Sequence, residues 1–335
     1  MSESHRNFFI FLGRSALFAV GFLFIFVAAN VFYHFRVVKN DIIFTLLDRF
    51  TKQDVQPHVL LLGDSHAALD IRSKFLDEGY YNFSSPGEGW REMILRMHAA
   101  VKLKKPITHV VIPLDDHAFA PYRANDLFFT NFLHFSDSED IKEVFKPSFA
   151  TFFKTRVSSA LPLVSPSNRS LLRKVIGEDV YAFMTKTTNE KAVILDAWGG
   201  MVPTDELVWS EFRESRRKEE IASRAAKHFR EPLVNKELMS LFEGFLAYCK
   251  QHNIMVIGVH YPVTTDYQNA GVSTNARELE ELHEQYRNLP LAAHFDYYHA
   301  FDHQQNYFRD PDHLNTAGAI VFSQMLMNDL REIIK

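Results

Sequence analysis

The sequence has little of what several classes of protein require. A single cysteine, Cys249, excludes an internal disulfide and a zinc site built from cysteines. Basic residues are not in excess, because 37 Lys and Arg stand against 41 Asp and Glu, for a net charge of −4. A nucleic-acid-binding protein needs such an excess to neutralise phosphates, so no nucleic acid is expected as a partner. Internal repeats and low-complexity tracts are also missing, and a hydrophobic content of 47% is typical of a chain that folds.

One long segment near the N-terminus lacks charge altogether. Residues 15–33 contain no charged side chain, and Asn30 is the only strongly polar one. As a helix this segment would span roughly 28 Å, close to the thickness of a bilayer core. We interpret it as a single-pass transmembrane anchor, with residues 1–14 in the cytoplasm and 34–56 as a membrane-proximal connector. Because basic residues flank it equally, the orientation is inferred from the large domain that follows, which is expected on the periplasmic or extracellular side.

A cleaved signal peptide is the alternative interpretation of the same segment. Residues 27–29 (VAA) are small enough to form a cleavage site. The apolar run nevertheless continues through Val31, Phe32 and Tyr33, which favours a retained anchor. Whether the segment is cleaved stays open at this point.

Residues 57–335 alternate between short apolar segments and amphipathic ones. This pattern predicts a parallel sheet covered on both faces, in a three-layer α/β/α flavodoxin-like domain. Strands are expected at 58–62, 80–83, 109–114, 254–260 and 293–297, and helices at 67–78, 90–104, 238–251, 278–288 and 316–334. An insertion at about 119–232 separates the third strand from the fourth. A helical cap over the carboxyl edge of the sheet and an ordinary surface elaboration are equally open interpretations of it.

The first motif whose side chains could take part in a reaction is Gly63-Asp64-Ser65-His66, at the end of the first predicted strand. Ligands of open parallel sheets bind beyond the carboxyl ends of the strands. A serine there is exposed and lies near a helix N-terminus, whose free N–H groups can stabilise an oxyanion. The alternative is that Ser65 only caps the following helix.

The second motif is Asp310-Pro311-Asp312-His313-Leu314-Asn315, just before the last predicted helix. A serine nucleophile needs a base, and that base needs an acid that fixes its tautomer. His313 and Asp310 can supply both from one loop. The alternative is a polar loop that caps the helix through Asn315 or Thr316.

Together the two motifs resemble those of the SGNH/GDSL hydrolase superfamily. The resemblance extends over roughly residues 55–335, apart from the insertion, and identifies Ser65 as the nucleophile with Asp310 and His313 as its acid–base pair. It implies oxyanion donors from the Ser65 N–H, from a glycine after the second strand, here Gly87, and from an asparagine after the third strand. Similar membrane-anchored envelope proteins act in O-acetylation of exported polysaccharides or in D-alanyl transfer to teichoic acid, commonly beside a membrane-bound O-acyltransferase.

The asparagine of the family pattern is missing. Asp115 falls nearest its position, and His117 follows. An ionised carboxylate would repel an oxyanion, so we expect Asp115 either to have a raised pKa or to be turned out of the site, with His117 as a substitute donor. On this hypothesis Asp115→Asn preserves or raises simple esterase activity. His260, at the end of the fourth strand, is expected to line the cleft, although a plain strand end with a turn proline is nearly as good an interpretation.

Other motifs are weaker. The sequence has no G-x-S-x-G nucleophile elbow and no H-E-x-x-H zinc motif, and we expect neither a metal nor a cofactor. The predicted function is transfer of an acyl group, expected to be acetyl, to or from an exported envelope polysaccharide through an acyl-serine intermediate. An envelope lipase or thioesterase, and a non-catalytic assembly subunit that partners a membrane O-acyltransferase, remain as alternatives. An apolar tunnel would favour the lipase, and an Asp310–His313 pair out of reach of Ser65 would favour the assembly subunit.

Overall fold

A computed structural model of the chain describes residues 3–52, 56–124, 132–133, 135–185 and 193–334. The chain divides into two compact units. The first unit comprises Met1–Thr45 and Pro147–Glu190, and the second comprises Leu46–Lys146 and Lys191–Lys335. Both sequence motifs lie in the second unit, which therefore contains the candidate site.

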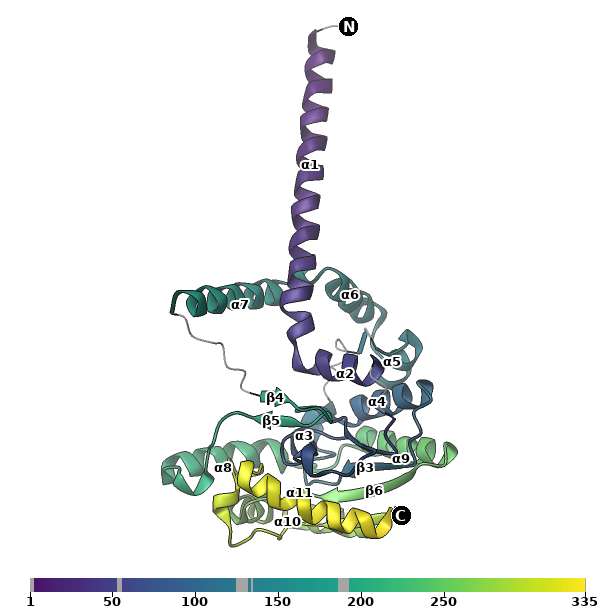
Figure 1. Cartoon of the computed structure of the whole chain (residues 1–335), viewed down its shortest axis with the longest axis vertical. Coiled ribbons are helices and arrows are strands. Elements are labelled where there is room, and N and C mark those ends of the chain that lie inside the picture. The colour runs from purple at the N-terminus through teal and green to yellow at the C-terminus, as the bar shows by residue number, and fades with distance from the viewer. Residues whose placement is uncertain (1–2, 53–55, 125–131, 134, 186–192, 335) are drawn as a thin grey trace. The chain divides into compact units, whose positions relative to one another are not determined.

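The second unit is built on a five-stranded sheet in the order β2-β1-β3-β6-β7, and all neighbouring strands run parallel. Figure 1 labels two neighbouring strands of this sheet, β3 and β6. The strands are β1 (Val59–Leu61), β2 (Tyr80–Asn82), β3 (His109–Pro113), β6 (Met255–His260) and β7 (Ala293–Asp296). Every residue of β1, β2 and β3 is buried, as expected for a sheet covered on both faces. This strand order is that of flavodoxin-like folds, so the predicted fold class is confirmed.

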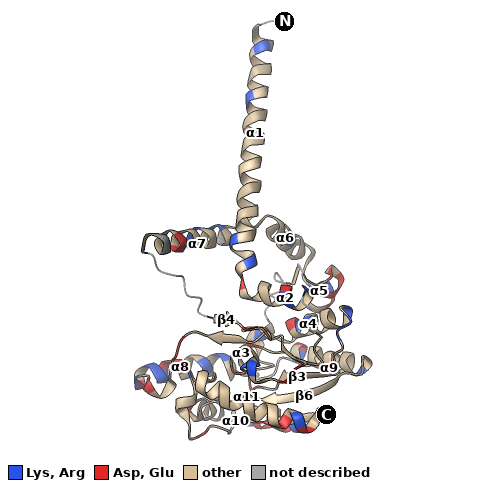
Figure 2. Ribbon diagram, in the orientation of Figure 1, with Lys and Arg blue, Asp and Glu red and all other residues tan. Residues whose placement is uncertain are grey.

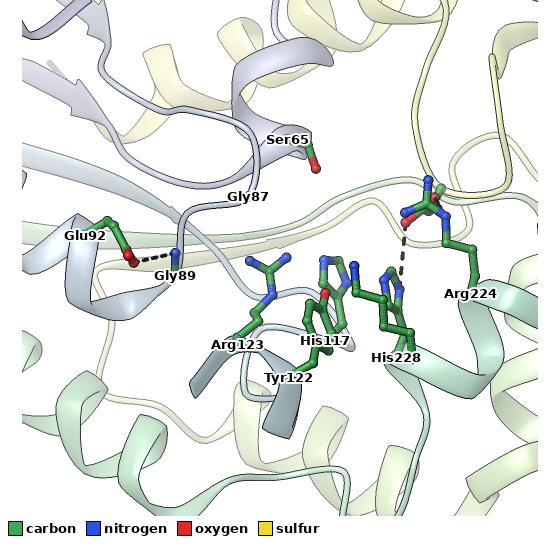
Figure 3. A pocket seen from close by; sticks show the side chains of 11 residues that line it. Ser65, Gly87, Gly89, Glu92, His117, Tyr122, Arg123, Arg224 and His228 are labelled. Atoms are coloured by element: carbon green, nitrogen blue, oxygen red, sulfur yellow. Dashed lines mark hydrogen bonds and ion pairs between the residues drawn. The ribbon is translucent and has the colours of Figure 1, made fainter. Parts of the chain in front are cut away.

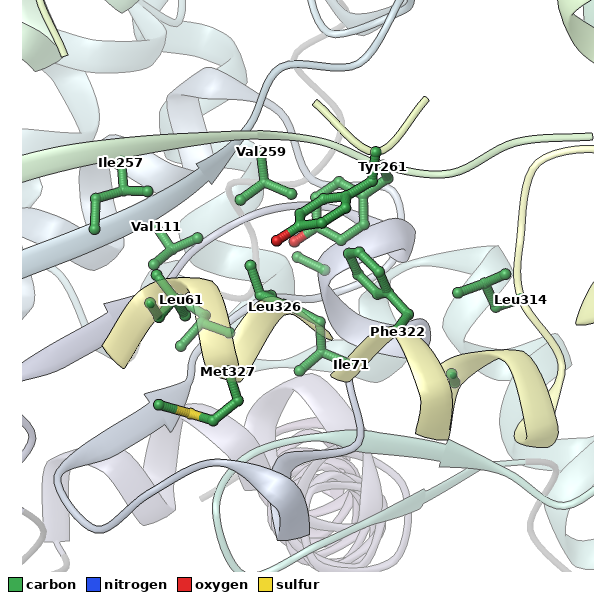
Figure 4. Close-up of a cluster of buried hydrophobic side chains, with 14 of the residues drawn as sticks. Leu61, Ile71, Val111, Ile257, Val259, Tyr261, Leu314, Phe322, Leu326 and Met327 are labelled. Atoms are coloured by element: carbon green, nitrogen blue, oxygen red, sulfur yellow. The ribbon is translucent and has the colours of Figure 1, made fainter. Parts of the chain in front are cut away.

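Helices cover the faces of this sheet. On one face Phe322, Leu326 and Met327 of α11 (Thr316–Ile333) pack against Leu61 and Val111 of the strands (Figure 4). Each such side chain contributes roughly 1.5–3 kcal/mol to stability by its burial. The other helices of this unit are α3 (Ser65–Leu69), α4 (Trp90–Lys102), α5 (Ser138–Phe145), α8 (Glu214–His228), α9 (Lys236–Gln251) and α10 (Thr265–Arg287).

The predicted strands agree with the structure to within one residue at each end, but the helix predicted over 67–78 is wrong. Only α3 is helical there, and the chain is extended at Arg72 before a short 3-10 turn, η2 (Ser73–Phe75). Hydrogen bonds from distant parts of the chain replace those of the helix. The Arg72 N–H donates to Ser323 Oγ at 2.7 Å, and the Asp70 carboxylate accepts from the Leu314 N–H at 2.9 Å. The helix predicted over 278–288 is the second half of α10, which is kinked at Asn275.

The insertion between β3 and β6 contributes to both units. Within the second unit it forms the 3-10 turn η3 (Pro121–Ala124), α5, α8 and an antiparallel hairpin of β4 (Val193–Leu195) and β5 (Met201–Pro203). The hairpin was not predicted. Within the first unit it forms α6 (Phe149–Ala160), the 3-10 turn η5 (Pro162–Val164) and α7 (Pro166–Thr185).

The first unit begins with α1 (Glu3–Arg36), a helix of 34 residues that extends beyond the predicted span at both ends. It carries no Lys, Arg, Asp or Glu between Arg14 and Arg36 (Figure 2). This helix is long and apolar enough to cross a membrane, but an N-terminal signal sequence can have the same length and composition. The next helix, α2 (Ile42–Lys52), crosses the boundary between the units, and its Phe50 stacks on Phe83 with ring centroids 4.0 Å apart.

Candidate active site

Ser65 is the first residue of α3, directly after the carboxyl end of β1. The helix is capped by Asp64, whose carboxylate accepts a hydrogen bond from the His66 N–H at 3.0 Å. Ser65 is therefore not needed as the cap, and its half-buried side chain is available for chemistry.

The two motifs meet at the carboxyl edge of the sheet. Ser65 Oγ lies 2.8 Å from Nε2 of His313, although 248 positions separate the two residues in the sequence. On the other side of the ring, Nδ1 of His313 lies 2.9 and 3.0 Å from the two carboxylate oxygens of Asp310. The same carboxylate accepts from the His313 N–H at 2.9 Å, which fixes the loop. The predicted contact between Ser65 and His313 is confirmed, and the arrangement is that of a serine, a base and an orienting acid.

The charge environment of His313 favours a protonated imidazole. Burial opposes protonation, but the negative charges of Asp310 and Asp312 outweigh it and raise the pKa of His313 above its ordinary value. A base of raised pKa accepts the proton of a serine hydroxyl more readily, provided that the pH is high enough to leave it neutral beforehand.

A second buried histidine lies directly behind the first. Nδ1 of His66 is 3.0 Å from Asp115 Oδ2, and its Nε2 is 3.7 Å from Asp312 Oδ2. Burial opposes the charge on His66, but the interactions with Asp115 and Asp312 outweigh it and hold its pKa well above the usual range. Its ring meets that of His313 edge-on, with centroids 4.9 Å apart. The raised pKa of His66 favours a positive charge directly beside His313, the candidate base.

A cavity of about 200 Å³ opens in front of Ser65 (Figure 3). Most of its lining residues have polar or charged side chains, and they come from five regions of the chain. The lining residues are Ser65, Gly87, Gly89, Glu92, His117, Tyr122, Arg123, Arg224, Lys227, His228 and Asp312.

Gly87 and Ser65 present backbone donors at this cavity. Gly87 has a φ of +82°, a conformation that residues with a side chain rarely adopt. Within the described part of the chain, neither the Ser65 N–H nor the Gly87 N–H donates a hydrogen bond to another protein group. Both are thus available to an oxyanion, as the resemblance implies.

Arg123 and His117 flank the cavity through their contacts with Asp64. One nitrogen of Arg123 donates to the Glu88 carbonyl at 2.6 Å, and the other pairs with the Asp64 carboxylate. Burial opposes ionisation of Asp64, but the charge of Arg123 outweighs it and keeps the pKa of Asp64 well below its usual range. His117 Nε2 lies 3.2 Å from Asp64.

The protonation of His117 follows from these neighbours. Burial and the charge of Arg123 lower the pKa of His117, so the ring is neutral near pH 7. Because the ionised Asp64 can only accept a hydrogen bond, the proton of the neutral ring must sit on Nε2. Nδ1 is then an acceptor, and His117 does not supply the donor expected of it from the sequence.

The third wall of the cavity is the C-terminal half of α8. Arg224 Nε lies 3.2 Å from Asp312, and His228 stacks on His117 with ring centroids 4.3 Å apart. The Lys227 ammonium lies over the ring of Tyr122, 4.4 Å from its centroid. This part of the insertion therefore borders the site, whereas α6 and α7 belong to the other unit.

Two residues predicted for the site lie outside the cavity. Asp115 is turned away from it, because one carboxylate oxygen accepts from the Tyr261 N–H at 3.1 Å and the other faces His66. His260 does not line the cleft either. Its Nε2 lies 3.3 Å from the buried Asp116 and its Nδ1 lies 3.4 Å from the exposed Asp296, so two carboxylates hold the buried ring outside the cavity.

The sequence prediction missed His66, Arg123, Arg224, Lys227 and Asp312. Two of these stand inside the recognised motifs and could have been considered as neighbours of Ser65 and His313. The other three stand in the insertion. Arg224 and Lys227 belong to a helix with several basic residues, α8, whereas Arg123 lies in the turn η3, where no sequence pattern marks it.

Three groups of side chains among the described residues could hold a metal ion. They are His66 with Asp312 and His313, Asp64 with Asp115 and His117, and Asp116 with His260 and His283. In the first group a metal on His313 Nε2 would replace the hydrogen bond to Ser65. In the third group Asp116 and His283 already make a direct contact at 2.6 Å.

Comparisons with known proteins leave the family open. No family model and no curated protein matches the sequence. Among solved structures, a protein provisionally named as a platelet activating factor from Streptococcus pneumonia is 10% identical, over 92% of this chain and 98% of its own, with a TM-score of 0.39. A protein provisionally named as an acylhydrolase from Bacteroides fragilis is 11% identical, over 86% and 97%, with a TM-score of 0.34. Similarity at this level carries no argument about activity, which rests on the geometry of the site.

Proposed function

We propose that this chain is a serine acyl hydrolase or acyltransferase of the SGNH type. The observation that carries the proposal is the continuous contact from Ser65 through His313 to Asp310, at 2.8 Å and 2.9 Å. A non-catalytic assembly subunit has no need for this geometry, which is why we prefer an enzyme. The five-stranded parallel sheet with Ser65 after its first strand agrees with the resemblance to that superfamily.

The reaction proceeds in two halves. His313 Nε2 takes the hydroxyl proton as Ser65 Oγ attacks the acyl carbonyl, and Asp310 stabilises the imidazolium that forms. The Ser65 and Gly87 N–H groups bind the oxyanion. When the intermediate collapses, His313 returns the proton to the leaving alcohol and Ser65 keeps the acyl group as an ester. Water or a sugar hydroxyl, deprotonated by His313, then attacks that ester and releases Ser65.

Arg123 takes the place of the missing asparagine as the third donor. Its guanidinium lines the cavity on the side of Gly87 and Gly89, and it carries a full positive charge (Figure 3). Asp64 compensates part of this charge, but the guanidinium has five N–H groups, and those that do not bind Glu88 or Asp64 can donate to a developing oxyanion. His117, with its acceptor nitrogen, is suited to orient the hydroxyl group of an acceptor.

The character of the cavity favours a small acyl group on a polar carrier. Arginine, lysine and histidine side chains form much of its lining, and its volume of about 200 Å³ leaves little room for a long alkyl chain. A lipase or thioesterase would need an apolar tunnel. We therefore favour acetyl transfer or removal on an exported cell-envelope polysaccharide, with a membrane-bound O-acyltransferase as the partner that supplies the acyl group.

The proposed location is the cell membrane, with α1 as a retained anchor and the catalytic unit on the periplasmic or extracellular side. Support for retention comes from the C-terminal part of α1, where Asn30 and Tyr33 are buried and Asn30 accepts a hydrogen bond from the Leu163 N–H. A reporter that is active only in the cytoplasm, fused after Lys335, should stay inactive. An active reporter would place the catalytic unit in the cytoplasm and would exclude an envelope glycan.

The activity is tested with a chromogenic acetyl ester and with a fluorophosphonate probe that labels activated serines. The full chain should hydrolyse the ester and take up the label, and Ser65→Ala should lose both while its thermal melting stays unchanged. Ser215→Ala, at an exposed serine of α8, is the matched control and should behave as the parent chain does. Labelling that persists in Ser65→Ala would overturn the assignment of the nucleophile.

A further inference from the structure

The first unit exposes an unusual amount of apolar surface. Helix α6 contains no buried residue, and its Phe149 and Phe153 are 84% and 60% exposed. On α7, Tyr181 and Met184 are 65% and 76% exposed. Further exposed apolar side chains in this segment are Leu161, Val164, Leu171, Ile176 and Val180. A surface of this kind in a folded protein marks an interaction site.

Two contacts tie this segment to the C-terminal part of α1. Asn30 Oδ1 accepts a hydrogen bond from the Leu163 N–H of η5 at 3.0 Å. Arg36 Nε donates to the Asp179 carboxylate of α7 at 2.8 Å. All four residues belong to the first unit, so the position of α6, η5 and α7 along α1 is defined.

These contacts set the depth of the segment along the α1 axis. Arg36 marks the end of the uncharged stretch of α1, and Asn30 lies six residues before it. At about 1.5 Å per residue, Asn30 is roughly 9 Å farther into the apolar part of the helix. Helices that lie in a membrane interface reach about 5–10 Å into the boundary between headgroups and acyl chains. The turn η5 is therefore at interfacial depth when α1 spans a bilayer.

The contact with Leu163 also explains how Asn30, the only strongly polar side chain of the predicted span, is accommodated. A polar group at membrane depth needs a partner, because no water is available to hydrogen-bond it. Asn30 meets this need on both sides, since its Nδ2 donates to the Phe26 carbonyl at 2.8 Å while its oxygen accepts from Leu163.

The charges of the segment fit the same environment. Between residues 147 and 185 stand five basic residues, Lys154, Arg156, Arg169, Arg173 and Lys174, against two acidic ones, Glu178 and Asp179. Long basic side chains can lay their aliphatic parts on an apolar surface and extend their charges to phosphate groups.

From these observations we propose that α6, η5 and α7 form a membrane-interface element, which inserts its apolar side chains among the phospholipids around the exit of α1. The partner is the surface of a phospholipid bilayer. The inference rests on the proposed function only in that it takes α1 as a retained membrane anchor.

The test uses the full chain in phosphatidylcholine nanodiscs whose lipids carry a nitroxide quencher near the headgroup. Cys249 is the only cysteine and is buried, so Cys249→Ser provides a background for single labelling sites. A fluorophore is attached after Phe153→Cys or Met184→Cys. Leu17→Cys in α1 reports on the anchor itself, and Lys218→Cys on α8, in the other unit, is the control in water.

Lipid quenching at positions 153 and 184 is expected to be at least about twofold stronger than at position 218, with protection from iodide in the aqueous phase. Quenching at position 17 but not at 153 or 184 would overturn the interface element and leave the anchor intact. If position 17 also escapes the lipid quencher, the anchor of the proposed function fails as well. Unchanged ester hydrolysis by the labelled variants shows that each remains folded.

Discussion

Asp115 Oδ2 lies 3.0 Å from Nδ1 of His66, the residue directly after the candidate nucleophile, and both side chains are buried. The acid that stands where the family pattern has an asparagine thus compensates a buried cation and does not face the acyl group. In the proposed mechanism, Asp115 acts only through His66, which meets the ring of His313. We therefore expect Asp115 to be a positioning residue for the candidate base.

The first prediction concerns the coupling between Asp115 and His66. Asp115→Asn removes the charge that supports the His66 imidazolium, so unfolding free energy at pH 6 should fall by roughly 1.5–3 kcal/mol, the range for hydrogen bonds to charged groups. A double-mutant cycle with His66→Gln should return a coupling energy of similar size from denaturant unfolding. Additive effects would show that the two side chains do not stabilise each other.

The pH dependence of this coupling has a definite sign. The pKa of His66 is raised in the folded chain, so the stabilisation is fully present below pH 6.5 and is lost as the pH rises through the folded pKa. The difference in unfolding free energy between the parent chain and Asp115→Asn should therefore shrink at high pH.

Asp115→Asn is also expected to lower ester hydrolysis, contrary to the expectation from sequence alone, because the group it changes lies behind His313 and not at the oxyanion.

The second prediction concerns His313, which must be neutral to act as the base. Because the charges of Asp310 and Asp312 raise its pKa, the acidic limb of kcat/KM should lie above pH 6.5. Asp310→Asn removes one of these charges, so the limb should move to lower pH while the maximal rate falls by about 10²–10⁴-fold through loss of orientation. Asp205→Asn, at an acid on the surface, serves as the control. If the acidic limb of kcat/KM lies at the same pH in Asp310→Asn and in the parent chain, Asp310 does not raise the pKa of the base.

Much of the fold could be predicted because its strands are short, mostly apolar and followed by turn residues. Ser65 and His313 were also predictable, because parallel strands end at one edge and bring distant loops together. The sequence could not tell on which side of the chain a residue after a strand projects. For Asp115 the sequence therefore left two positions open, and the hydrogen bond from the Tyr261 N–H belongs to the one in which it is turned out of the site. His260 was expected to line the cleft, whereas Asp116 and Asp296 hold its ring elsewhere.

The contribution of the insertion was beyond reach for a different reason. Arg123 and Arg224 reach the cavity through contacts with Asp64 and Asp312, which are far away in the sequence. Local patterns reveal that the segment around Arg224 is a basic helix, but not which carboxylate Arg224 faces, and nothing local marks Arg123. The break after α3 has a similar origin, because a hydrogen bond from Arg72 to Ser323 competes with the local helical pattern.

The third prediction tests Arg123 as a donor to the oxyanion. Arg123→Lys keeps the positive charge but loses the planar fork that reaches the Glu88 carbonyl and the Asp64 carboxylate together. We expect kcat to fall by roughly 10²–10³-fold with little change in KM, as for loss of one oxyanion donor. Lys227→Met, at the outer wall of the cavity, should instead raise KM if it contacts the carrier.

The melting temperature of Arg123→Lys has to be followed alongside, because Arg123 also compensates Asp64. A variant that melts as the parent chain does and keeps its kcat would remove Arg123 from the mechanism. A higher KM with an unchanged kcat would make Arg123 a binding group for the substrate.

The last prediction concerns Asp70, which is buried and accepts a hydrogen bond from the N–H of Leu314, the residue after His313. Burial raises the pKa of Asp70 to about 7. The unfolded chain releases this proton near pH 4, whereas the folded chain keeps it until about pH 7. Folding stability should therefore fall across this window by up to about 1.4 kcal/mol per pH unit, because the folded state binds the extra proton.

Asp70→Asn keeps an oxygen for Leu314 and cannot ionise. Its unfolding free energy relative to the parent chain, measured by urea titration at several pH values, should rise between pH 4 and 7 and level off above. The constant cost of burying the amide cancels in this comparison, since it is the same at every pH. A difference that stays flat over the whole range would mean that Asp70 is already ionised in the folded protein at low pH, with a positively charged neighbour such as His313 as its partner.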